Sequence, residues 1–330
     1  MLQLKNNTPF VSAFTVFPNE DGMDTLYIMV KATFVIGAQW TLADPQIGLQ
    51  QGDEYWGDPS KTSLRLSSDY HIGKPSTDIL MIGSAYAPAQ RPIRQMDVGL
   101  QVGSVSKIVR VFGDRFWNRD QITQPEPFVT MPLVYERAFG GQDFVDGLIR
   151  DTETKNPVGC GFAGRKHLTE VNGLALPNLE CPKQLIRHFN DRPEPACFAP
   201  IAPNWQPRAS FAGGYDDVWQ QTRAPYLPDD YSPRFMNVAP PDLIYPDYLR
   251  GGEPVKIIGM NTAGDLVFSL PHVNLSNKVL IAEQEFSAPF NMETLLLDPN
   301  HLKLSMVWRA ALPCDKKLTK IKHISVSLSR

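Results

Sequence analysis

The sequence predicts a mainly β protein of antiparallel, sandwich-like sheets, with a long proline-rich irregular middle segment and few short helices. Three observations predict this class. Apolar residues alternate with period two near both ends of the chain, turn residues separate the alternating stretches, and prolines concentrate between them. The chain has 330 residues, of which 42% are hydrophobic and 20% charged, so it can bury a sizeable core.

The N-terminal third carries the clearest strand pattern. From Thr25 to Ile36 every second residue is apolar, which predicts a strand with one buried face and a second face that is partly covered. Two further alternating stretches, Val98–Val102 and Val105–Phe112, flank Gly103-Ser104. A glycine at the first central position suits a two-residue type II′ turn, so these stretches predict a hairpin.

The C-terminal 80 residues repeat this behaviour. Two predicted strand pairs are separated by turn residues: 255–260 with 266–270, and 293–297 with 302–308. The tail alternates Ile324, Val326 and Leu328 with serines, which predicts a last strand with one buried face.

Prolines mark the middle of the chain. Thirteen of the 29 prolines lie in the 70 residues from Pro177 to Pro246, where they disfavour long helices and central strands. The same segment is rich in aromatic residues, unlike a solvated linker, so we expect an ordered brace packed on the sheets. Short helices are expected near Lys183–Phe189 and Asp216–Gln221. The chain is then one interlocked unit, 1–330, with lobes 1–140, 141–250 and 251–330.

Charge and composition argue against several classes of protein. The net charge is −3, with 32 basic and 35 acidic residues, whereas binding to nucleic acid or an anionic membrane favours a basic excess. No run of 18 apolar residues predicts a membrane span, and the first residues do not resemble a signal peptide. Four cysteines do not suggest a disulfide scaffold, so we expect a cytoplasmic location.

The residue types that bind metals or nucleotides form no recognisable motif. Cys160, His167, Cys181 and Cys197 lack the close spacing of zinc ligands, and buried or incidental thiols are the favoured interpretation. The signatures of zinc proteases, α/β-hydrolases and phosphate-binding loops are absent. We therefore expect no metal site and no nucleotide hydrolysis.

Acidic residues beside turns leave two interpretations open. The candidates are Asp114, Glu136, Asp216-Asp217, Asp229 and Asp230. Structural ion pairs and caps are the favoured role for such residues. The alternative is a hydrolytic, carbohydrate-active enzyme, which would hold two carboxylates across an aromatic-lined pocket. The glycine pairs at 140–141, 213–214 and 251–252 are expected in tight bends that need positive φ.

An ordered series of short motifs carries a family resemblance over most of the chain. The motifs are residues 7–10, 30–34, 57–59, 63–65, 74–78, 110–115, 132–141, 156–159, 176–180, 205–208, 227–230, 239–242, 251–254 and 307–309. In this series the chain resembles a bacterial domain-of-unknown-function family whose members are encoded beside type VI secretion spike proteins and toxins.

The resemblance implies an accessory role, with no cofactor and no established catalytic residues. Members look like effector adaptors or chaperones that stabilise a toxin, commonly one with a PAAR-like domain, and help to load it on the VgrG spike. A structural component that travels with the spike is a further interpretation. The proline-rich segment offers candidate partner-binding residues: Trp205, Arg208, Tyr215, Trp219 and Tyr226. The alternative for these residues is that they pack the interior.

Overall fold

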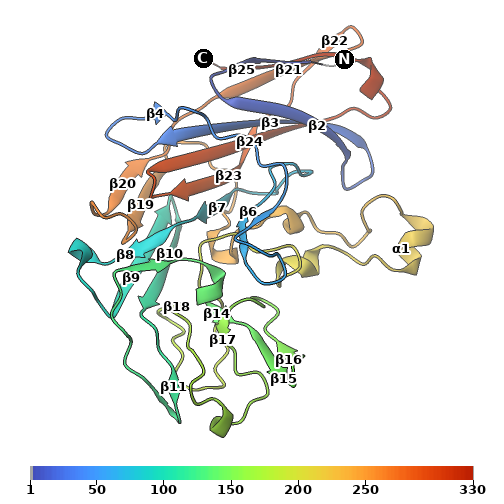
Figure 1. The fold of residues 1–330 in the computed structure, drawn as a ribbon. Coiled ribbons are helices and arrows are strands. Elements are labelled where there is room, and N and C mark those ends of the chain that lie inside the picture. Colours follow the sequence, from blue (N-terminus) through green and yellow to red (C-terminus); the bar gives the residue numbers. More distant parts are fainter. Residues whose placement is uncertain (1–2, 330) are drawn as a thin grey trace.

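The computed structural model describes residues 3–329 and confirms the mainly β class (Figure 1). Several mostly antiparallel sheets make up the molecule, and within the described range the single α-helix is α1, Asp217–Thr222. Short 3₁₀ turns occur at Pro88–Gln90, Tyr135–Arg137, Leu168–Glu170, Arg208–Phe211, Pro233–Met236, Pro241–Leu243 and Leu318–Lys320.

The largest sheet joins the two ends of the chain. Its strand order is β2-β3-β24-β23-β7, with β4 added beside β3. The strands are β2 (Val11–Pro18), β3 (Asp24–Val35), β4 (Thr41–Leu42), β7 (Asp78–Met81), β23 (Asn291–Asp298) and β24 (Lys303–Pro313). Strand β3 is buried on both faces from Thr25 to Phe34, so its second face is covered more completely than the sequence pattern predicts.

A five-stranded sheet has the order β18-β10-β9-β19-β20. Its strands are β9 (Gln95–Val102), β10 (Val105–Phe112), β18 (Leu179–Glu180), β19 (Pro254–Ile258) and β20 (Leu266–Ser269). The predicted hairpin is confirmed, because Val102 pairs with Val105 and the intervening Gly103 has a φ of +55°. The predicted pair across residues 261–265 is also present, as β19 and β20.

A four-stranded sheet with the order β1-β25-β21-β22 brings the first and last strands together. Its strands are β1 (Leu4–Asn7), β21 (Leu275–Ile281), β22 (Gln284–Phe286) and β25 (Ile321–Leu328). The tail strand buries Ile324 and Val326 as the alternation predicts. Strand β1 runs parallel to β25, and β7 likewise runs parallel to β23, so the antiparallel rule has local exceptions.

The remaining strands form short two-stranded ribbons: β5 (Glu54–Tyr55) with β6 (Leu64–Leu66), β8 (Ser84–Tyr86) with β13 (Thr130–Pro132), β11 (Trp117–Asn118) with β12 (Gln121–Ile122), β14 (Phe139–Gly140) with β17 (Cys160–Gly161), and β15 (Gln142–Val145) with β16 (Leu148–Thr152). Two buried apolar clusters underlie the sheets. The main core includes residues from all three predicted lobes, and a smaller satellite cluster is built around Trp117, Phe139 and Phe162.

The proline-rich segment is ordered and irregular, and α1 forms close to its predicted place. The helix predicted near Lys183–Phe189 is wrong, because this stretch forms turns. Side chains take the backbone donors that a helix would use: the Glu180 carboxylate accepts from the Ile186 N–H at 2.8 Å, and Asp191 accepts from the N–H groups of Arg187 and His188 at 2.8 and 2.9 Å.

Candidate functional site

The five aromatic and arginine residues predicted to bind a partner are divided between the interior and the surface. Trp205 is 3% exposed and meets the Tyr135 ring edge-on at 5.4 Å. Arg208 is also buried, where it donates to the backbone oxygens of Ile201 and Phe235 at 2.9 and 2.8 Å. Burial lowers the pKa of Arg208. The prediction is therefore corrected for Trp205 and Arg208, whose large side chains complete the core instead of reaching the surface.

The other three residues lie together on an arm, residues 211–232, that carries α1 away from the sheets (Figure 1). Tyr215 and Tyr226 are exposed, and Trp219 is half-buried. The rings of Tyr215 and Trp219 meet edge-on at 4.8 Å, and the indole N–H of Trp219 donates to the backbone oxygen of Tyr226 at 2.8 Å. These contacts fix the position of the Trp219 side chain beside Tyr215 and the Tyr226 backbone.

The arm is attached to the body through Arg223. Its guanidinium donates to the backbone oxygens of Leu227 at 2.9 Å and Glu20 at 2.8 Å, and it pairs with the Asp229 carboxylate at 3.1 Å. The Asp216 side chain caps α1 by accepting from the Trp219 N–H at 2.9 Å. The arm is thus braced against the turn between β2 and β3.

A second surface feature, which the sequence interpretation missed, is the β15–β16 hairpin. Its strands pair only with each other within the described residues, so both outer edges are free. Four apolar side chains at its tip are exposed: Phe144 (53%), Val145 (42%), Leu148 (74%) and Ile149 (56%). Phe144 pairs with Ile149, and Val145 pairs with Leu148. Successive pairs point to opposite faces of the hairpin, so both faces carry apolar side chains.

The signal that could have found this hairpin is the dipeptide Asp146-Gly147 between two apolar pairs. Both residues adopt positive φ, +52° and +78°, as a type I′ turn requires. An Asp-Gly turn between apolar residues is among the strongest short-range hairpin signals.

The base of the hairpin is fixed by a buried carboxylate. Asp143 is 0% exposed and accepts from the Arg150 guanidinium at 2.7 Å, from the Arg165 N–H at 3.1 Å and from the Lys166 ammonium. Burial alone would raise its pKa, but these hydrogen bonds and the Lys166 charge outweigh it and lower the pKa of Asp143 to about 2. The apolar tip therefore projects from an anchored base.

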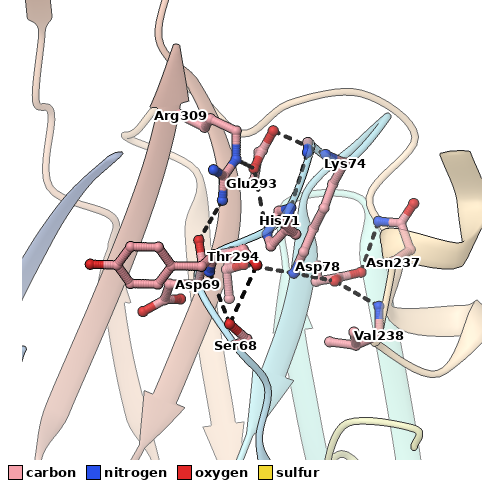
Figure 2. A network of polar contacts seen from close by, with 12 residues as sticks. Ser68, Asp69, His71, Lys74, Asp78, Asn237, Val238, Glu293, Thr294 and Arg309 are labelled. Atoms are coloured by element: carbon pink, nitrogen blue, oxygen red, sulfur yellow. Dashed lines mark hydrogen bonds and ion pairs between the residues drawn. The ribbon is translucent and has the colours of Figure 1, made fainter. Parts of the chain in front are cut away.

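A buried polar network lies where the largest sheet meets the loop of residues 68–77 and the proline-rich segment (Figure 2). Three ion pairs form it, each nearly inaccessible: Lys31 with Asp69 at 3.0 Å, Lys74 with Asp78 at 2.7 Å, and Arg309 with Glu293 at 2.7 Å. Each carboxylate has one cationic partner, so the buried charges balance.

Neutral groups also take part in the network. Lys74 also donates to the Thr294 hydroxyl at 2.9 Å, and the second Arg309 nitrogen donates to the Asp69 backbone oxygen at 2.6 Å. His71 lies 3.8 Å from Glu293, but burial and the charges of Arg309 and Lys74 hold its pKa well below 6.5. His71 is therefore neutral among ion pairs whose charges match. These pairs hold the loop of residues 68–77 against the strands of the largest sheet, which is a structural role.

The acidic residues considered for catalysis make hydrogen bonds and ion pairs with neighbouring loops and strands. Glu136 accepts from both the N–H and the hydroxyl of Ser63 at 2.7 Å, and Asp230 accepts from the Gly214 N–H at 2.9 Å. Asp114 accepts from the Asn178 amide at 2.9 Å and lies 3.6 Å from Arg137. These are the contacts of caps and ion pairs.

The positive φ expected at the glycine pairs is found at five of their six members, the exception being Gly214. Gly140 is the last residue of strand β14. A Cβ on Gly140 would lie 2.1 Å from the backbone oxygen of Asn156, so there is no room for a side chain.

The cysteines are free thiols, and burial raises the pKa of Cys160 to about 12 and that of Cys197 to about 11. Between residues 3 and 329, no three His, Cys, Asp or Glu side chains are grouped so that they could hold a metal ion. In the same range, none of the helices has the length and apolar character needed to cross a membrane.

Comparison with known protein families gives a match over most of the chain. Residues 21–309 match the model of a family described as "Uncharacterized protein conserved in bacteria (DUF2169)". Searches of curated proteins and of solved structures found no match.

Proposed function

The chain belongs to the DUF2169 family of bacterial proteins, and from this premise we propose that it is an adaptor or chaperone for a type VI secretion effector. It stabilises a toxin that carries a PAAR-like domain and helps to load it on the VgrG spike. The role is non-enzymatic, needs no cofactor, and is carried out in the cytoplasm. The motif series that resembles the spike-associated family suggests these partners.

The observation that carries the proposal is the exposed apolar tip of the β15–β16 hairpin. Single exposed apolar residues are normal on protein surfaces, but four adjacent large ones on a projecting element are typical of an interaction site. Covering these four side chains with a partner removes their apolar surface from water, which favours binding.

The anchored base favours tight contact. Because Asp143 and its three donors hold the hairpin in place, little conformational entropy is lost when a partner covers the tip. The aromatic side chains of the α1 arm offer a second exposed surface of the kind enriched in protein interfaces. A near-balanced net charge of −3 also suits a protein partner better than a polyanion.

The first test deletes the gene in its native host and measures toxin abundance and recovery of the toxin with the spike. The adaptor function predicts that both fall, while the protein itself stays in the cell. Unchanged values for both would refute the proposal. Recovery of the protein in the secreted fraction would instead identify it as a component that travels with the spike.

The second test changes the hairpin tip. We expect Leu148→Asp to weaken toxin binding by about tenfold or more, because an exposed interface anchor is replaced by a charge that must be desolvated on contact. Val267→Asp is the matched control, because Val267 is a strand residue of similar exposure (73%) on β20. Equal binding by the two folded variants would exclude the hairpin from the interface.

A further inference from the structure

The free edge of strand β10 lies in a groove built by the proline-rich segment. Val102 and Val105 form the hydrogen-bonded pair that closes the β9–β10 turn. In an antiparallel pair the bonding direction alternates, so Lys107 bonds to β9, whereas the N–H and C=O groups of Ser106 and Ile108 point outward.

No strand covers that part of the edge. Strand β18 pairs with β10 only at Arg110 and Val111, and the N–H of Phe112 donates to the Asn178 oxygen at 2.8 Å. Among residues 3–329, no further backbone hydrogen bond reaches Ser106 or Ile108 from the outer side. Two donors and two acceptors therefore remain open, about 6.8 Å apart along the strand.

These open groups line a cavity of about 740 Å³. Five prolines also line this cavity and form an apolar proline wall: Pro182, Pro195, Pro207, Pro240 and Pro241. Proline has no backbone N–H, so this wall offers apolar surface without backbone donors. The groove thus combines a strand edge with an apolar proline wall.

Of the three lysines that line the groove, two form ion pairs within the described part of the chain and one does not. Lys107 pairs with Asp242 at 2.9 Å, and Lys155 pairs with Glu194. Lys183 also lines the groove, and no carboxylate between residues 3 and 329 forms an ion pair with it. An occupant with an acidic side chain near Lys183 would complete the pairing.

We propose that this groove binds an extended, largely apolar segment of the partner protein, with an acidic residue near Lys183, as an added strand on β10. Backbone hydrogen bonds to Ser106 and Ile108 provide the register, and the proline wall covers alternate side chains of the segment. The spacing of the open groups selects an extended chain over a compact ligand. This inference rests on the proposed function in taking the partner to be a protein.

The direct test uses the full chain and a short fluorescein-labelled peptide of alternating valine and threonine with one glutamate. Ile108→Pro removes one open donor and blocks the edge, so we expect about tenfold weaker peptide binding by fluorescence anisotropy. The matched control is Val267→Pro, because the N–H of Val267 points outward on β20, at the opposite edge of the same sheet. A peptide with proline at alternate positions, which cannot form the ladder, should not bind.

Ile108→Asp and Val267→Asp repeat the comparison without altering the backbone, in case either proline variant fails to fold. Ile108 is 54% exposed, so its replacement leaves the core intact. Equal peptide affinity for the folded 108 and 267 variants, or no binding by the wild-type chain, overturns the proposal. A wild-type dimer that dissociates on Ile108→Pro would also overturn it, since a second copy would then occupy the edge.

Toxin recovery separates this inference from the adaptor function. If the toxin co-purifies with wild type and equally with Ile108→Pro, the groove proposal fails and the adaptor function stands. If no toxin co-purifies but the peptide binds wild type and not Ile108→Pro, the groove stands and the adaptor function fails.

Discussion

The buried carboxylate of Asp78 accepts three hydrogen bonds from two different parts of the chain. It is 0% exposed and accepts from Lys74 at 2.7 Å, from the Asn237 amide at 2.9 Å and from the Val238 N–H at 2.8 Å. It thereby joins β7 to the proline-rich segment (Figure 2). Removing one member of a buried ion pair costs more than the pair itself contributes, because the remaining charge has no partner.

We therefore predict that Asp78→Ala lowers the free energy of unfolding by about 3–5 kcal/mol, measured by urea denaturation. The exposed pair of Lys278 with Glu285 at 3.3 Å provides the control, and Glu285→Ala should cost less than about 1 kcal/mol. Equal losses for the two variants would contradict the role assigned to the network.

His71 gives the network a pH dependence. Its pKa is held well below 6.5 in the folded protein, so below that pH the unfolded chain binds a proton that the native state does not. The contribution of neutral His71 to the free energy of unfolding is fully present above pH 6.5. It decreases as the pH falls below that value, by up to about 1.4 kcal/mol per pH unit. We expect His71→Asn to flatten this slope between about pH 6.5 and 5.5, in urea titrations at each pH. The same change at the exposed His323 should leave the slope as in wild type.

At the scale of elements, sequence patterns predicted strands well where one face is apolar and a turn follows. The β9–β10 hairpin, the β23–β24 pair and the tail strand β25 are found where alternation and turn residues place them. The failed helix near Lys183–Phe189 depends on carboxylates that capture backbone donors, which a local pattern does not reveal. The interior positions of Trp205 and Arg208 depend on tertiary packing, which composition alone does not determine.

The β15–β16 hairpin yields a prediction at this scale. Asp143→Ala removes the acceptor that holds Arg150 and Lys166, so the base of the hairpin should loosen. We expect amide hydrogen exchange in residues 142–152 to rise about tenfold or more, while exchange in β3 stays unchanged. Asp151→Ala is the control, because its ion pair with Arg165 is exposed and 3.8 Å long. Unchanged exchange in Asp143→Ala would show that the anchor is dispensable.

At the scale of the molecule, segments distant in sequence share the same sheets. Strands β3 and β24 are neighbours in the largest sheet, and β1 pairs with β25. The satellite cluster around Trp117 is tied to the five-stranded sheet through the buried pair of Arg115 with Glu180 and the β10–β18 ladder. These links favour cooperative unfolding of the chain as one unit.

Single-tryptophan versions of the chain provide the measurement. Trp117 reports on the satellite cluster and Trp308 on the main core. We expect their fluorescence transitions in urea to have the same midpoint and to coincide with loss of far-ultraviolet circular dichroism. An earlier transition at Trp117 would identify the satellite cluster as a separately unfolding unit.

The pairing of β3 with β24 also affects how the protein is made. Val35 ends β3 and Lys303, its pairing partner, begins β24 and follows it by 268 positions in the sequence. At roughly 5–20 residues per second, the ribosome needs tens of seconds to synthesise that length. During this interval β3, which is buried from Thr25 to Phe34 in the folded protein, is paired on its β2 side but not on its β24 side. Newly made chains therefore pass through a period in which β3 is open to wrong strand pairing, and general folding chaperones should bind nascent chains that end before β24.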